Sequence, residues 1–165
     1  MYKENDYVIY KKDVVRIVNI KTNQLNNMKY YVLVPINDES LKIDVPVDNR
    51  LGHIRPLMTK KEIKEIIKKI PEIGIIETNN KLIENEYREL LNENSRENLI
   101  KIIKTTYLRN KERLDNNKKI GDKDNYYFNL AEKYLYTEIA IVLNISYDEA
   151  CEYIKKEVSK VVNGK

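Results

Sequence analysis

The sequence is poor in the residues on which most catalytic and metal-binding sites depend. Its 165 residues include one cysteine (Cys151), one histidine (His53), four glycines and no tryptophan. A single histidine excludes multi-histidine metal sites, and so few glycines leave no P-loop or dinucleotide-binding fingerprint. A lone cysteine excludes a disulfide within the chain and is typical of a reducing cytoplasm. We therefore expect neither a metal nor another cofactor.

Long apolar runs are missing as well. No segment is long and apolar enough to cross a bilayer, and the first ten residues, MYKENDYVIY, lack the pattern of a signal peptide. Hydrophobic residues nevertheless make up 42% of the chain, which is enough for a packed core. We therefore expect a soluble, cytoplasmic protein that does not bind a membrane.

Charged residues are abundant, but they form no recognisable catalytic set. Acidic residues alternate with lysines, as in KKEIKEIIKK at residues 60–69, and such mixtures are usually solvated ion-pair faces. The formal net charge is only +4, so local clustering would have to indicate nucleic-acid binding. We expect a protein that is not an enzyme and binds no small molecule. The alternative, an acid pair that only the fold assembles, would require a deep pocket with convergent carboxylates.

The first third of the chain has the pattern of short β-strands. β-Branched and aromatic residues fill four runs, at residues 7–10, 14–20, 29–35 and 41–47. Strands this short, joined by turn-forming segments such as TNQLNN and INDES, are best stabilised by curling into a small β-barrel over residues 1–57. The third and fourth runs are the candidate edge strands. Pro46 indicates an edge or a strand end because it cannot donate a hydrogen bond.

From Met58 onwards the hydrophobic period becomes that of an α-helix. Helix-start signals occur at five places: the capping boxes Thr59–Glu62 and Ser146–Glu149, Asn79 or Asn80, Ser95, and Asp122. Pro71 should end the first helix, and the apolar side of the third should extend as far as Leu114. Five amphipathic helices with short connections predict an all-α domain over residues 58–165, so the expected fold class is α+β.

Basic residues gather around one loop of the helical half. They are Arg109, Lys111, Arg113, Lys118, Lys119 and Lys123. Four acidic residues dilute the cluster, while Tyr126 and Tyr127 beside it add the aromatic character that a surface for a nucleic-acid backbone can use. A solvated helix–helix junction is the alternative interpretation of the same charges.

The order of these features resembles the CarD/CdnL family of bacterial transcription regulators over nearly the whole chain. In the first half the matching stretches are DYVIY at 6–10, VVRIVNI at 14–20, YYVL at 30–33 and LKIDVPV at 41–47. In the helical half they are YREL at 87–90, Arg109-x-x-x-Arg113 and Phe128-x-x-Ala131. The resemblance implies an SH3/Tudor-like N-terminal domain that binds the RNA polymerase β subunit. It also implies a helical domain that contacts promoter DNA at the upstream fork, and the two together would tune the stability of the open complex.

This chain departs from the family at positions that bear on the polymerase contact. Two turns at which the family has glycine hold Asn5 and Asp13, which tolerate a positive φ better than most residues do. Positions at which some members place arginines against polymerase hold Asn23 and Asp44, so backbone pairing and nearby lysines would have to carry more of the contact. The expected polymerase-binding residues are Lys21, Asn23, Tyr31, Lys42, Asp44 and Pro46.

The DNA contact is affected too, because many family members have a wedge tryptophan at the start of the second C-terminal helix. Here Ile83 aligns with it, as an apolar wedge or as a core residue, and Asn85 and Glu86 replace basic positions. We expect a contact that is weaker or displaced towards the basic cluster. The expected DNA-binding residues are Ile83, Arg88, Arg109, Arg113, Lys118, Lys119 and Lys123. The alternative function is a protein–protein adaptor without DNA binding, and we expect a monomer.

Overall fold

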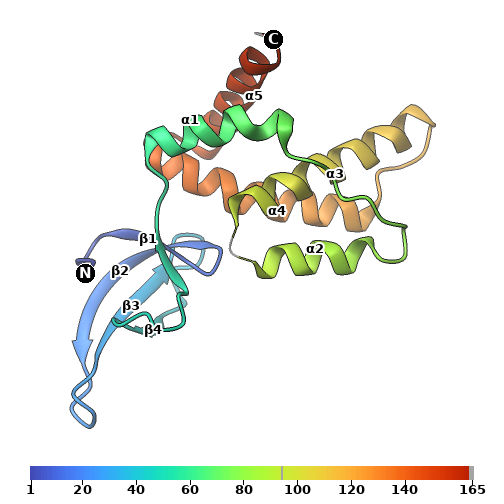
Figure 1. Cartoon of the computed structure of the whole chain (residues 1–165). Helices are drawn as coiled ribbons and strands as arrows, with labels where there is room; N and C mark the ends of the chain where they lie inside the picture. The colour runs from blue at the N-terminus through green and yellow to red at the C-terminus, as the bar shows by residue number, and fades with distance from the viewer. Residues whose placement is uncertain (94, 164–165) are drawn as a thin grey trace. The chain divides into compact units, whose positions relative to one another are not determined.

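The computed structural model describes residues 1–93 and 95–163 and shows an α+β fold, with strands followed by helices (Figure 1). Met1–Leu57 and Met58–Lys165 form two compact units, called here the β-unit and the helical unit. The division lies at the residue where the hydrophobic period of the sequence changes. Each unit has its own hydrophobic core.

The β-unit is an antiparallel sheet of five strands in the order β4-β3-β2-β1-β5. They are β1 (Tyr7–Tyr10), β2 (Asp13–Thr22), β3 (Lys29–Pro35), β4 (Ile43–Pro46) and β5 (Ile54–Pro56). The four predicted strands are confirmed, while the three residues of β5 are too few to show an alternating pattern. In the described residues the sheet is open rather than a closed barrel, because β5 pairs with β1 and leaves β4 as the other edge.

Two finer expectations about this sheet need correction. The third predicted strand, β3, is not an edge, because β2 and β4 flank it; β4 is an edge, and Pro46 is its last residue. Asn5 has the expected positive φ, at 72°, but after the first strand it is Lys11 (φ 58°), not Asp13, that adopts this conformation. The turn therefore bends two residues earlier than the family comparison suggested.

The pleat of the sheet separates core side chains from the opposite face. One face supplies the core residues Val8, Val15, Ile17, Tyr31, Leu33, Val45 and Ile54. The register places Tyr30 opposite both Lys21 and Pro46, and Val32 opposite Asp44. Because directly paired residues share a face and neighbours along a strand alternate, Lys21, Asp44 and Pro46 lie on the other face.

The described part of the helical unit contains five α-helices, as expected. They are α1 (Lys60–Lys69), α2 (Ile83–Asn92), α3 (Arg96–Asp115), α4 (Asp122–Leu143) and α5 (Tyr147–Asn163), with a 3-10 helix, η1 (Ile70–Glu72), after α1. Thr59 and Glu62 form the predicted capping box, since each side chain accepts a hydrogen bond from the other residue's N–H. Among these helices none combines the length and the apolar character required to cross a membrane.

Several helix boundaries differ from the prediction. α2 begins at Ile83 because the Asn79 side chain instead accepts hydrogen bonds from the Lys81 and Leu82 N–H groups, which forms a turn. Ser95 caps α3 as predicted. Asp122 is the first residue of α4 rather than its cap. The apolar side of α3 does not reach Leu114, which lies exposed near the end of the helix.

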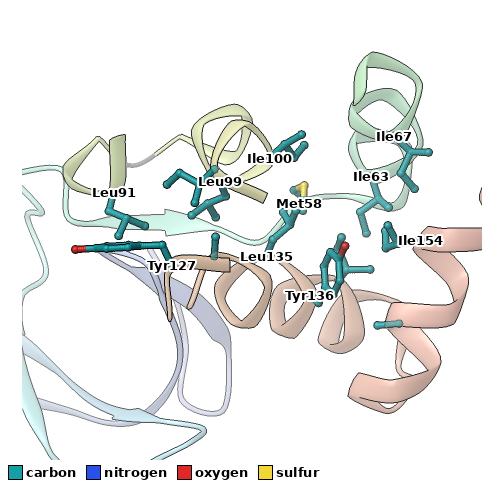
Figure 2. Packing of buried hydrophobic residues seen from close by; sticks show 14 of the residues in the cluster. Met58, Ile63, Ile67, Leu91, Leu99, Ile100, Tyr127, Leu135, Tyr136 and Ile154 are labelled. Carbon is teal, nitrogen blue, oxygen red and sulfur yellow. The ribbon is translucent and has the colours of Figure 1, made fainter. Parts of the chain in front are cut away.

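Side chains from all five helices form the core of the helical unit. Figure 2 shows Met58, Ile63, Leu99, Leu135 and Ile154 lying close together among α1, α3, α4 and α5. Burying each such side chain contributes on the order of 2 kcal/mol. These contacts hold in place the helices that carry the charged surface residues of the helical unit.

Candidate binding surfaces

The edge strand β4 presents backbone groups to the open side of the sheet. The Val47 N–H donates to the Lys29 carbonyl at 3.0 Å, so this pair and, at two-residue steps along the ladder, Tyr31 with Val45 and Leu33 with Ile43 are the hydrogen-bonded pairs between β3 and β4. Because such pairs alternate along an antiparallel ladder, the backbone of Asp44 and of Pro46 points away from β3. The open side therefore offers one donor, the Asp44 N–H, and one acceptor, the Asp44 carbonyl, because the Pro46 carbonyl accepts the Asn49 N–H at 3.2 Å.

Besides Pro46, three of the predicted polymerase-binding residues have side chains at or reaching this edge. Lys21 and Asp44 form an ion pair of 2.6 Å, which reaches across β3 from β2 to β4. Both partners are exposed, so the pair contributes little to stability and can open to meet a partner. Lys42 is exposed directly before β4. At this edge the backbone N–H and carbonyl of Asp44 thus have no partner in β3, and charged side chains of both signs lie beside them.

Asn23 and Tyr31 have roles within the β-unit instead. In the β2–β3 hairpin, the Asn23 side chain accepts the Leu25 N–H at 2.9 Å, so it shapes the turn. The prediction that Tyr31 touches a partner is wrong, because its ring is 2% exposed and its hydroxyl accepts the Tyr2 N–H at 3.0 Å. Strand alternation alone could not show which of the two adjacent tyrosines faces the core.

Several exposed apolar residues of the β-unit lie outside the predicted sites. Leu25 is 97% exposed and Leu51 80% exposed, and Met28 and Leu41 are also exposed. A hollow of about 470 Å³ beside the end of β4 is lined by Tyr10, Met28, Val45, Pro46, Leu51 and His53, among others. No periodic pattern identifies such residues, because they lie in loops or at strand ends.

In the helical unit, the fold commits Arg109 to a buried network. Its Nε donates to both carboxylate oxygens of Asp124, at 3.0 and 3.2 Å, and the Tyr87 hydroxyl donates to the same carboxylate at 2.8 Å. Asp124 is buried. The burial of Tyr87 and its hydrogen bond to Asp124 raise the pKa of Tyr87. Arg109 therefore holds α3 against the start of α4, while its contact with DNA stays a prediction.

Glu84 similarly engages two of the predicted DNA-binding cations. Its carboxylate lies 2.9 Å from the Lys123 ammonium and 3.0 Å from the Arg88 guanidinium. The hydrogen bond from Lys123 is the largest of the effects that lower the pKa of Glu84. Tyr127 accepts a hydrogen bond from Arg88 Nε at 3.4 Å. Arg88 and Lys123 stay on the surface, but the Glu84 carboxylate offsets much of their positive charge.

Arg113, Lys118 and Lys119 are the predicted cations with the fewest internal contacts. Lys118 and Lys119 are exposed in the α3–α4 loop. A polar hollow of about 230 Å³ is lined by Asn80, Arg109, Glu112, Arg113, Asn116 and Lys118. Arg109 is paired with Asp124, so Arg113 and Lys118 are the cations of this hollow that could meet an oxyanion such as a phosphate.

The side chain that aligns with the family's tryptophan is buried. Ile83 is 4% exposed and belongs to the helical core, so the wedge hypothesis for Ile83 is wrong. The residue before it, Leu82, is 48% exposed at the start of α2. The helical phase that buries Ile83 therefore exposes its neighbour.

The described residues contain no group of three or more histidine, cysteine or acidic side chains that could hold a metal ion. Comparisons with known proteins yield no relative: no protein-family model matches this chain, and no curated protein matches it.

Proposed function

We propose that this protein is a transcription regulator similar to the CarD/CdnL family. In this proposal the β-unit is an SH3/Tudor-like domain that binds the RNA polymerase β subunit through β4, and the helical unit contacts promoter DNA near the upstream fork. Binding to the open complex more tightly than to the closed complex would shift the equilibrium between them by the difference in binding free energy. No step of this mechanism requires a catalytic residue.

The observation that carries the proposal is the open edge of β4. A strand with uncommitted backbone donors and acceptors can accept a strand from a partner protein. The register leaves the backbone N–H and carbonyl of Asp44 in that position, next to the Lys21–Asp44 ion pair and Lys42. The contact then depends on backbone pairing, which tolerates the absence of the arginines that some family members use.

For the DNA contact, the arrangement favours the α3–α4 loop. Arg113 and Lys118 line the polar hollow and Lys119 is exposed beside it, whereas Arg109 is held by Asp124. Leu82 is the exposed apolar side chain nearest in sequence to the position of the family's wedge, and aliphatic side chains can act as wedges between base steps.

A second candidate function, a protein–protein adaptor that uses β4 alone, is favoured by the way in which the fold occupies the basic residues. Glu84 offsets Arg88 and Lys123, and Asp124 holds Arg109. Under this hypothesis the helical unit has no DNA surface, and its charges stabilise the fold or keep the protein soluble.

Two binding measurements on the full chain test the proposal. Binding to purified core RNA polymerase is expected, and no binding at micromolar concentration would contradict the polymerase contact. A salt titration of binding to a forked promoter duplex is expected to show affinity that falls as salt rises. Polymerase binding without DNA binding, even at low salt, would favour the adaptor.

A further inference from the structure

The hollow at the end of β4 combines side chains that belong to or pack against the core, Val45 and Tyr10, with the exposed apolar side chains of Met28 and Leu51. Leu51 and Met28 stand exposed at its rim, and the Tyr10 and His53 rings meet edge to face, 6.1 Å apart. Exposed apolar groups around a concave site, beside a free strand edge, are typical of an anchor site for a partner side chain.

The charged residues of this hollow are already paired. Asp48 lies 2.8 Å from Arg50 Nε, and Asp44 lies 2.6 Å from Lys21 Nζ. A charged partner side chain would have to break one of these pairs and lose water on entering, whereas an apolar side chain would break none. The hollow therefore favours an uncharged, apolar occupant.

The register of β4 indicates how such a side chain would arrive. A strand that pairs with the outward N–H and carbonyl of Asp44 places its next residue opposite Val45. Directly opposed residues share a face, and Val45 lies on the face of Tyr10 and lines the hollow. Side chains at alternate positions of an added strand give such contacts their specificity.

We propose that the hollow lined by Tyr10, Met28, Val45, Leu51 and His53 receives one bulky apolar side chain from a partner strand that pairs with β4. This inference rests on the proposed polymerase contact and adds to it the residue type that selects the segment of the β subunit. Backbone pairing would supply affinity for any extended segment, and the hollow would discriminate among segments.

The test is the affinity of full-length variants for core RNA polymerase in the absence of DNA. Met28→Ser/Leu51→Ser makes the rim polar, and because both residues are exposed, the melting temperature should stay unchanged. We expect this variant to bind about tenfold more weakly than the unmodified chain. Met28→Leu/Leu51→Met keeps the rim apolar and should bind as well as the unmodified chain. Leu114→Ser, an exposed leucine of the helical unit, is the matched control and should have no effect.

The outcomes separate this inference from the proposed function. If the unmodified chain does not bind polymerase, the proposed function fails, and the inference that rests on it fails too. If the unmodified chain binds and Met28→Ser/Leu51→Ser binds equally well, the polymerase contact stands and the role of the hollow is overturned. An equal loss in Leu114→Ser, or a loss in the conservative variant as large as in the serine variant, would also overturn it.

Discussion

The β-unit and the helical unit use their polar groups in opposite ways. At the edge of the β-unit, the backbone N–H and carbonyl of Asp44 point away from the sheet, and the ion pair of Asp44 with Lys21 is exposed. In the helical unit, carboxylates engage the predicted cations, most completely where buried Asp124 holds Arg109. A polar group can serve a partner only after the needs of the fold are met, so a count of charges does not identify an interface.

The largest expected effect comes from Asp124→Ala, which tests whether the charges of the helical unit are structural. Removal of this carboxylate leaves the half-buried Arg109 guanidinium and the buried Tyr87 hydroxyl without their partner. We expect the free energy of unfolding to fall by about 3 kcal/mol, measured by urea denaturation. Asp115→Ala, at an exposed position of α3, is the control and should change it by less than about 0.5 kcal/mol. Equal effects would mean that Asp124 is not structurally special.

Asp44→Pro tests the edge of the β-unit. Proline removes the one outward N–H of β4 and is tolerated on edge strands. We expect polymerase binding to weaken by about tenfold, since a charge-free backbone hydrogen bond at a buried contact is worth about 1 kcal/mol and the ring also hinders the incoming strand. Asp44→Ala separates the effects, because it breaks the ion pair with Lys21 but keeps the N–H. If the alanine variant loses as much affinity, the carboxylate matters rather than strand pairing.

Lys118→Glu/Lys119→Glu tests whether any of the helical charges remain available. We expect DNA affinity at low salt to fall by about tenfold, with a shallower dependence on salt, because each phosphate contact adds to the slope. Lys123→Glu should have a smaller effect, since Glu84 already pairs with Lys123. Polymerase binding should not change in either variant. A loss of both DNA binding and polymerase binding would contradict the assignment of DNA binding to the helical unit and polymerase binding to the β-unit.

The smallest expected effect is a gain. Glu84→Gln removes the carboxylate that pairs with Arg88 and Lys123. Because Lys123 lowers the pKa of Glu84 below its ordinary value of 4.5, the group is ionised at pH 7 and the substitution removes a full negative charge. We expect DNA affinity to rise by about threefold, as for a surface pair of this kind. A decrease would mean that Glu84 positions the two cations for DNA instead of competing with it.

The expected elements appear in the structure where the sequence signal is local and strong. The capping box at Thr59 and the cap at Ser95 mark helix starts, and four alternating runs mark strands. The start of α2 was misplaced because Asn79 caps a turn as readily as a helix. For the candidate site, Pro46 predicts the edge position of β4 and a core position is one of the two alternatives for Ile83, but no local pattern predicts the burial of Tyr31.

By itself, the sequence determined the order of strands and helices, the change in period at Met58 and the identity of the charged residues. These follow from backbone preferences and from hydrophobic periodicity, which act over a few residues. The tertiary structure decided which of two neighbours faces the core, as at Leu82 and Ile83, and which cations keep a free surface. Those choices depend on contacts between residues far apart in the chain, such as Arg109 with Asp124 or Lys21 with Asp44, and a local pattern contains no information about such pairs.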